Sequence, residues 1–131
     1  MIGAFCLYKQ MEKKHTVVIG ASPNTSRYSY RAVEMLKAAD HPVEAVGLRE
    51  GEISGVTITK ELKPFADVDT VSLYVGPRNQ DYWKEYIKEL KPKRVIFNPG
   101  TENKDFQMDL VNEGIEVEEA CTLVLLSMGS Y

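Results

Sequence analysis

The sequence has 131 residues, of which 44% are hydrophobic and 27% charged, and its 16 basic and 19 acidic side chains give a net charge of -3. This length fits one globular domain, and the composition excludes disordered and fibrous proteins. The charge is small and mixed in sign, so neither a nucleic acid nor a membrane surface is an expected partner.

The two cysteines, Cys6 and Cys121, are far apart and form no C-x-x-C pair. A disulfide framework or a metal site is therefore not expected, and a reducing cytoplasm is the expected location. Residues 1–14 are predicted to be an N-terminal extension, followed by a folded domain over residues 15–131. The apolar stretch 1–8 is too short to span a membrane and has no basic segment before it.

The first half of the domain alternates between β-branched runs and helical spacing. Residues 15–20 (HTVVIG) predict a buried strand, and the loop ASPNTS leads from it into a helix over residues 27–39. The apolar face expected for this helix comprises Tyr28, Ala32, Met35, Leu36 and Ala39. Residues 42–48 predict the second strand, and residues 56–59 a short third strand at best.

The second half continues the same alternation. Predicted strands cover residues 70–75, 94–98 and, as an edge strand, 115–118. Helices are expected over residues 79–90 and from about Asn103 to a stop at Gly114. The apolar stretch 121–126 fits either a helix or a strand, and we favour a short packing helix.

Strands joined by helices of this length predict right-handed crossovers and a parallel sheet. The expected fold is therefore α/β: a single Rossmann-like, doubly wound parallel sheet of about five strands, with helices on both faces. In such a sheet ligands bind beyond the carboxyl ends of the strands, where the strand order reverses.

Three loops are expected to leave those carboxyl ends near the reversal, at residues 20–27, 76–79 and 98–103. They are rich in Gly, Pro, Ser, Thr and Asn. Gly20 is expected to let the backbone approach a ligand, and the start of the following helix suits a phosphate group. The same residue types serve in any strand-to-helix connection, so loop composition alone leaves both interpretations open.

The dinucleotide fingerprint G-x-G-x-x-G is absent, since the segment GASPNT at residues 20–25 has only its first glycine. After the second strand the chain carries Leu48 and Arg49, where an NAD site favours an acidic residue for the ribose hydroxyls. A cation at this place suits a ligand with an additional ribose phosphate. Coenzyme A (CoA) and NADP both have one.

The run VVIGASPN at residues 17–24, followed by Arg27, the segment SYR at 29–31 and Leu36, resembles the stand-alone CoA-binding domain family. This family is related to the CoA-binding domain of the succinyl-CoA synthetase α subunit. The similarity extends from about His15 to Leu126. The chain departs from the family at GLR (47–49), where members carry Asn-Pro, and at NPG (98–100), where Gln-x-Gly is commoner. No second domain with a phosphorylated histidine is expected from this sequence, so the resemblance does not imply ligase activity.

The loops and the resemblance together predict a set of residues that bind the ligand. Val75 and Pro77 are expected to contact the adenine and Arg49 the ribose phosphate. The pyrophosphate is expected at the N–H groups of residues 21–24 and at the start of the following helix. The complete predicted set is Gly20, Ala21, Ser22, Pro23, Asn24, Arg27, Leu48, Arg49, Val75, Gly76, Pro77, Asn98, Pro99 and Gly100.

No catalytic residue is predicted. His15 and His41 fall at the amino ends of strands, Ser22 has no histidine to activate it, and Cys121 fits a small core residue. The expected function is non-catalytic binding of CoA or acyl-CoA by a protein that is not an enzyme. The alternatives are a minimal NADP-dependent oxidoreductase and a vestigial nucleotide-binding fold that acts as an interaction module. The expected partner is a small-molecule ligand, and a homodimer is left open.

Overall fold

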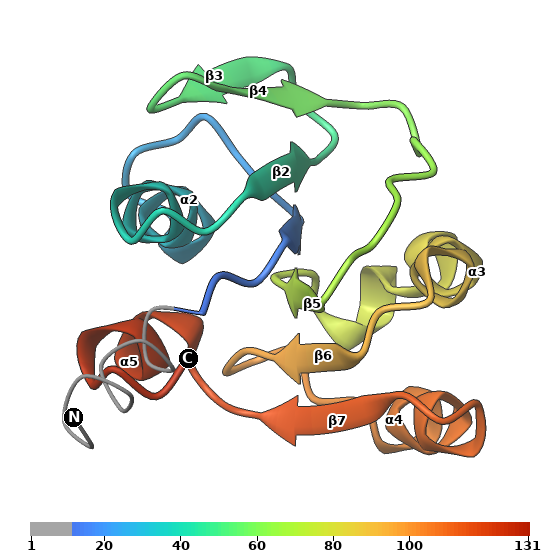
Figure 1. The fold of residues 1–131 in the computed structure, drawn as a ribbon. Coiled ribbons are helices and arrows are strands. Elements are labelled where there is room, and N and C mark those ends of the chain that lie inside the picture. The colour runs from blue at the N-terminus through green and yellow to red at the C-terminus, as the bar shows by residue number, and fades with distance from the viewer. Residues whose placement is uncertain (1–11) are drawn as a thin grey trace, which may run out of the picture.

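The structure is a computed structural model, and it describes residues 12–131. The predicted N-terminal extension therefore lies, apart from its last three residues, outside the described part. Within that part, seven strands form one sheet in the order β3-β4-β2-β1-β5-β6-β7 (Figure 1). The strands are β1 (Thr16–Ile19), β2 (Val43–Val46), β3 (Gly51–Ile53), β4 (Val56–Thr59), β5 (Thr70–Leu73), β6 (Arg94–Phe97) and β7 (Glu116–Glu119).

Helices lie on both faces of this sheet, and three of the six connections between consecutive strands contain a helix. They are α2 (Tyr28–Ala38), the 3-10 helix η1 (Pro77–Asn79), α3 (Asp81–Leu90), α4 (Lys104–Asn112) and α5 (Thr122–Ser127). Helices α2 and α5 cover one face, and α3 and α4 cover the other (Figure 1). Because all strand pairs except β3–β4 are parallel, the predicted Rossmann-like α/β class is confirmed. The short C-terminal helix is confirmed as α5.

The predicted number of about five strands is wrong, because the sheet has seven. The expectation missed β3, which pairs with β4 in an antiparallel hairpin. The two residues of its turn, Ser54 and Gly55, have φ values of 49° and 84°. Such a turn suits the twist of a hairpin, but a serine with positive φ is an uncommon signal. A strand of three residues is also too short to show an alternating pattern.

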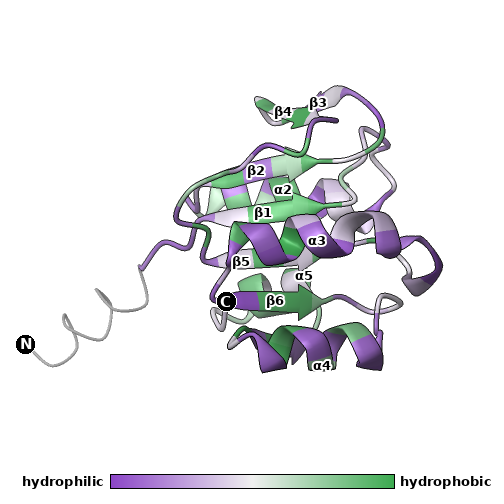
Figure 2. Ribbon diagram, turned by 90° about the vertical axis from the view of Figure 1, so that its right-hand side faces the viewer, coloured by the Kyte–Doolittle hydropathy of each residue, from purple (hydrophilic) through white to green (hydrophobic). Residues whose placement is uncertain are grey.

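The hydrophobic core lies on both sides of the sheet. Val17 and Ile19 of β1 pack toward α3 and α4, whereas Val18 packs toward α2. Figure 2 shows largely hydrophilic outer surfaces on α3 and α4 and hydrophobic strands behind them. Such strands, buried on both faces, are typical of a parallel sheet. No helix within residues 12–131 is long and apolar enough to cross a membrane.

The buried face of α2 differs from the predicted one. Ala32 and Leu36 are buried as expected, but Ser29 and Val33 complete the buried face. Tyr28 remains 72% exposed. As the first residue of α2, Tyr28 lies at the carboxyl edge of the sheet and not above the core.

Candidate functional site

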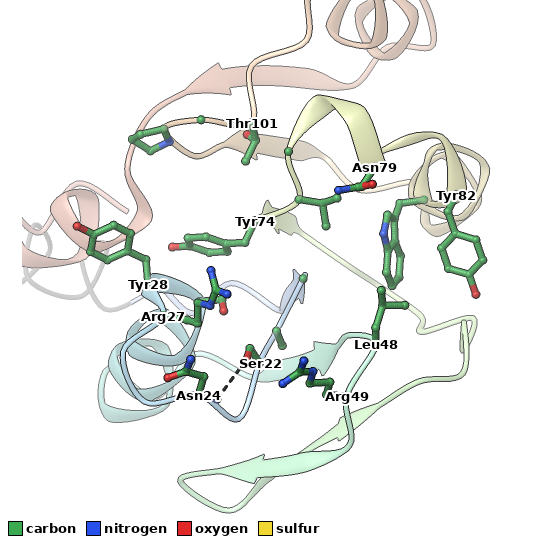
Figure 3. Close-up of a pocket in the computed structure, with 18 residues that line it drawn as sticks. Ser22, Asn24, Arg27, Tyr28, Leu48, Arg49, Tyr74, Asn79, Tyr82 and Thr101 are labelled. Carbon is green, nitrogen blue, oxygen red and sulfur yellow. Dashed lines mark hydrogen bonds between the residues drawn. The ribbon is translucent and has the colours of Figure 1, made fainter.

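The strand order reverses between β1 and β5, since the chain passes from β1 to β2 on one side and later places β5 on the other. A pocket of about 820 Å³ lies beyond the carboxyl ends of the strands at this point (Figure 3). Its volume falls in the upper part of the usual range for ligand pockets, about 300–1,000 Å³. The pocket therefore has room for a ligand of dinucleotide size.

The structure brings most of the predicted binding residues together around this pocket. Those that line it are Gly20, Ala21, Ser22, Asn24, Arg27, Leu48, Arg49, Val75, Gly76, Pro99 and Gly100. They come from four separate loops, after β1, β2, β5 and β6. That they bind a ligand stays a prediction, but their common location follows from the parallel sheet.

Three predicted residues lie outside the lining of the pocket. Pro23 sits beside Gly51, the first residue of β3. Pro77 begins η1 and is exposed. Asn98 is buried, and its side chain is turned into the fold.

The Asn98 amide makes three hydrogen bonds inside the protein. Its Nδ2 donates to the Ser72 Oγ at 3.0 Å and to the Leu73 carbonyl at 2.9 Å. Its Oδ1 accepts the Thr122 N–H at 2.9 Å. The side chain therefore joins β5, β6 and α5, and its polar atoms are already occupied.

The loop after β1 uses several of its polar groups to hold its own shape. The Asn24 N–H donates to the Ser22 Oγ at 3.1 Å (Figure 3). The Asn24 Oδ1 accepts the Ser26 N–H at 3.0 Å. The Ala21 N–H donates to the Val46 carbonyl at 3.0 Å. Because Pro23 has no N–H, Ser22 is the one residue among 21–24 whose N–H has no partner within the described structure.

The start of α2 supplies further free donors at the same place. Arg27, the N-cap residue, makes no side-chain capping hydrogen bond. The N–H groups of Tyr28 and Ser29 have no partner within residues 12–131, and both residues line the pocket. Unpaired N–H groups at a helix start carry a partial positive charge. These free donors lie at the helix start, where the sequence predicts a phosphate, and anion binding there stays a prediction.

Two glycines shape the pocket for reasons internal to the fold. Gly20 has a φ of +91°, and a Cβ there would lie 2.9 Å from the Tyr74 carbonyl oxygen. At Gly47 a Cβ would fall on the Ala21 carbonyl oxygen. The fold therefore requires glycine at position 20 because of the residues that follow β5, and a close approach of Gly20 to a ligand stays a prediction.

The charged side chains in the lining are Arg27 and Arg49, and the lining includes no acidic residue. Neither arginine forms an ion pair within the described structure. Figure 3 shows both side chains directed into the pocket from opposite sides. With the free N–H groups of α2, they make the pocket suitable for an anionic ligand with more than one phosphate.

Part of the lining was not predicted from the sequence: Tyr28, Ser29, Tyr74, Asn79, Tyr82, Trp83 and Thr101. Trp83 is 3% exposed and belongs to the hydrophobic core, but it also reaches the pocket wall. Its ring meets that of Tyr82 edge to face, with 5.0 Å between centroids. The position of Tyr82 and Trp83 in the sequence could have indicated this place, because the first turn of a helix that follows a parallel strand lies at the carboxyl edge of the sheet.

Tyr74 follows β5 directly and places its ring in the pocket wall. Its hydroxyl is buried and has no hydrogen-bond partner within the described residues. Burial raises the pKa of Tyr74 to about 12, while the nearby hydroxyls of Thr122 and Ser72 act in the opposite sense. The phenol therefore stays protonated at neutral pH.

Both histidines lie away from the pocket, as predicted. The His15 Nε2 lies 3.0 Å from a carboxylate oxygen of Glu44, and the His41 Nδ1 accepts the Lys14 N–H at 3.0 Å. Neither residue lines the pocket, and Cys121, at the start of α5, does not line it either. No group of three or more metal-ligating side chains occurs within residues 12–131.

A doubly wound sheet with a pocket at its reversal point and a helix start facing that pocket defines a Rossmann-like domain of the nucleotide-binding type. Residues 14–127 match the sequence profile of the CoA binding domain. The chain belongs to this CoA-binding domain family. Among curated proteins, none matches the sequence.

Solved structures share the fold of this chain. A crystal structure of an uncharacterized protein shares 48% sequence identity, with a TM-score of 0.89 over 92% of this chain and 99% of that chain. A hypothetical protein from Pyrococcus horikoshii OT3 shares 19% identity, with a TM-score of 0.80 over 95% and 89% of the two chains. Aspartate dehydrogenase from Thermotoga maritima shares 18% identity, with a TM-score of 0.53 over 81% of this chain and 45% of the enzyme. The last two similarities show the fold alone.

Proposed function

We propose that this protein binds CoA or acyl-CoA in the pocket at the carboxyl edge of its sheet and does not transform it. The observation that carries the proposal is the positive charge of the pocket, in a chain that belongs to the CoA-binding domain family. Its charged side chains are Arg27 and Arg49, and free N–H groups of α2 face the same space.

The residues present fit the parts of CoA. The pyrophosphate suits the N–H groups of Ser22, Tyr28 and Ser29, with Arg27 beside them. Arg49 suits the 3′-phosphate of the ribose, as the sequence predicts. This arrangement leaves the opposite end of the pocket, beyond the helix start, for the pantetheine chain.

The adenine suits the apolar side of the pocket next to Arg49. Leu48, Val75, Tyr82 and Trp83 line that side. Aromatic and aliphatic side chains stack well on a base because every base has an apolar face. Trp83 replaces Pro77 in the predicted pair of adenine contacts, because Pro77 lies outside the lining.

The side chains of the lining support a binding role over catalysis. The lining includes no His, Cys, Lys, Asp or Glu, so it offers its serine and threonine hydroxyls none of the usual general bases. The hydroxyl of Tyr74 keeps its proton because its pKa is raised to about 12. We therefore expect no turnover of acetyl-CoA or NADPH.

Titration calorimetry on protein shown to be free of ligand tests the proposal. We expect micromolar affinity for CoA, about -8 kcal/mol, and a rise in the unfolding temperature, since the ligand binds only the folded state. If millimolar CoA produced no binding heat and no shift in the unfolding temperature, the proposal would be contradicted. Tighter binding of NADP than of CoA would favour the oxidoreductase, and no response to either would favour the interaction module.

A further inference from the structure

Gln80 lies between η1 and α3 and is completely buried, with 0% exposure. Its Nε2 donates to the Val75 carbonyl at 2.8 Å and to the Thr101 carbonyl at 2.7 Å. Its Oε1 accepts a hydrogen bond from the Asn103 Nδ2 at 2.9 Å. One buried amide therefore uses both of its N–H bonds and its oxygen inside the protein.

The two carbonyls belong to different loops. Val75 lies in the loop that follows β5, and Thr101 lies in the loop that follows β6. Both residues line the pocket, whereas Gln80 does not. No backbone hydrogen bond joins residues 74–80 to residues 99–103 within the described structure. The Gln80 side chain thus bridges two walls of the pocket from behind.

Asn103 extends the same network to the next helix. It is the N-cap residue of α4, and its Oδ1 accepts the Phe106 N–H at 3.3 Å. Its own Nδ2 is the donor to Gln80. The start of α4 and both loops are therefore held by a single set of side-chain amides.

We propose that Gln80 is a positioning residue for the ligand, which ties the loops after β5 and β6 together so that the pocket wall is formed before the ligand arrives. This inference rests on the proposed function. Loops that must be ordered during binding reduce the affinity, and loops that are already ordered do not. A buried amide suits this role because leaving its carbonyl partners unpaired is unfavourable, so the bridge has one stable arrangement.

The test compares Gln80→Met with Tyr86→Phe. Methionine has a similar size but donates no hydrogen bond to either carbonyl. Tyr86 lies on α3, the helix whose N-cap residue is Gln80. It is 4% exposed and donates to the Lys63 carbonyl at 2.7 Å, away from the pocket. Both variants remove hydrogen bonds from nearly buried side chains to backbone carbonyls. We expect Gln80→Met to weaken CoA binding at least tenfold and Tyr86→Phe to change it less than twofold.

A second variant, Gln80→Glu, adds the pH dependence of CoA affinity as a measurement that a general loss of stability would not change. Its carboxylate would face the Val75 and Thr101 carbonyls and repel them, whereas the protonated acid donates one hydrogen bond. We expect CoA affinity, relative to the wild type, to recover as the pH falls. Amide hydrogen exchange in residues 99–103 should be faster in Gln80→Met than in the wild type. Should Gln80→Met fail to fold, Gln80→Glu carries the test through its pH dependence.

The outcomes separate the two proposals. Wild-type protein that does not bind CoA would overturn the proposed function and, with it, this role of Gln80. Wild-type protein that binds CoA while folded Gln80→Met binds it within twofold would overturn the role of Gln80 alone. Equal losses in Gln80→Met and Tyr86→Phe, or a Gln80→Glu variant without pH dependence, would also overturn it.

Discussion

Arg49 and Arg27 enter the pocket from different loops, after β2 and at the start of α2. Figure 3 shows Arg49 near Leu48, on the side proposed for the adenosine, and Arg27 on the side of Tyr28. We therefore expect the two guanidinium groups to meet different phosphates of CoA. A ligand that lacks one phosphate distinguishes between them.

The change Arg49→Ala should weaken CoA binding and leave 3′-dephospho-CoA nearly unaffected. Losing one charge-assisted contact costs about 1.5–3 kcal/mol, or roughly ten- to a hundred-fold in affinity. Arg27→Ala is the matched control and should weaken both ligands by similar factors. Titration calorimetry with both ligands measures the difference. Equal weakening of both ligands by Arg49→Ala would show that Arg49 does not contact the ribose phosphate.

Gly76 lines the pocket, and Gly47 directly follows β2 next to the lining residue Leu48. The two glycines differ in the space around them. A Cβ at Gly47 would fall on the Ala21 carbonyl oxygen, whereas a Cβ at Gly76 would meet no atom within 4 Å. The backbone of Gly76 is also unstrained for other residues, with a φ of -64°. Gly47 is therefore required where the chain after β2 passes the loop after β1.

We expect Gly47→Ala to lower the free energy of unfolding by about 3 kcal/mol, because backbone atoms would have to move apart. Gly76→Ala should change it by less than about 0.5 kcal/mol, as ordinary surface substitutions do. Urea unfolding curves of the two variants measure both values. Similar stability of the two alanine variants would contradict the close approach at Gly47.

At the scale of elements, α5 depends on a neighbouring strand for its capping. Its N-cap residue, Cys121, makes no side-chain capping hydrogen bond. The N–H of Thr122 instead donates to the Asn98 Oδ1, and the Thr122 hydroxyl lies 2.7 Å from the Ser72 Oγ. Helix α5 is therefore attached to the sheet through two side chains: Asn98, which follows β6, and Ser72, which belongs to β5.

The change Asn98→Ala should lower the free energy of unfolding by about 2–3 kcal/mol, because buried partners lose their hydrogen bonds. Amide exchange in α5 should accelerate more than exchange in α3, on the opposite face. The matched control is Asn112→Ala, an exposed amide at the end of α4. Unchanged stability in Asn98→Ala would show that the Asn98 amide does not secure α5.

At the scale of the whole molecule, the amino end of the sheet collects positive charge. Burial lowers the pKa of His41, and the charges of Lys13, Lys14 and Arg94 lower it further, while Asp69 acts in the opposite sense. The His41 Nδ1 accepts the Lys14 N–H, and this hydrogen bond requires a free electron pair on the ring nitrogen. The folded protein therefore favours neutral His41.

A lowered pKa in the folded state makes stability depend on pH in one direction. Unfolded His41 binds a proton near pH 6.5, above the pKa of the folded state, so the unfolded state carries more protons in that range. The contribution of neutral His41 to the free energy of unfolding should be complete above about pH 6.5 and decrease as the pH falls below that value. The free energy of unfolding, measured with urea between pH 5 and 8, should depend less steeply on pH in His41→Gln than in the wild type. Identical slopes would contradict the preference for neutral His41.

Most of the fold was predictable from periodicity. Buried strands and amphipathic helices have different repeats, and their alternation defines a parallel sheet with helices on both faces. The same reasoning placed the loops after β1, β5 and β6 at one edge. The hairpin of β3 and β4 was not predictable in full, because Gly51–Ile53 is too short for a pattern and its turn contains Ser54.

The sequence alone determined that the loops around the pocket share one edge of the sheet, because parallel strands have all their carboxyl ends at the same edge. It did not determine which side chains face the pocket. Asn98 turns into the fold and Trp83 reaches the pocket wall, since side-chain direction depends on how each helix packs on the sheet. The bridge made by Gln80 and the need for glycine at position 47 likewise depend on contacts between distant segments, which only the tertiary structure decides.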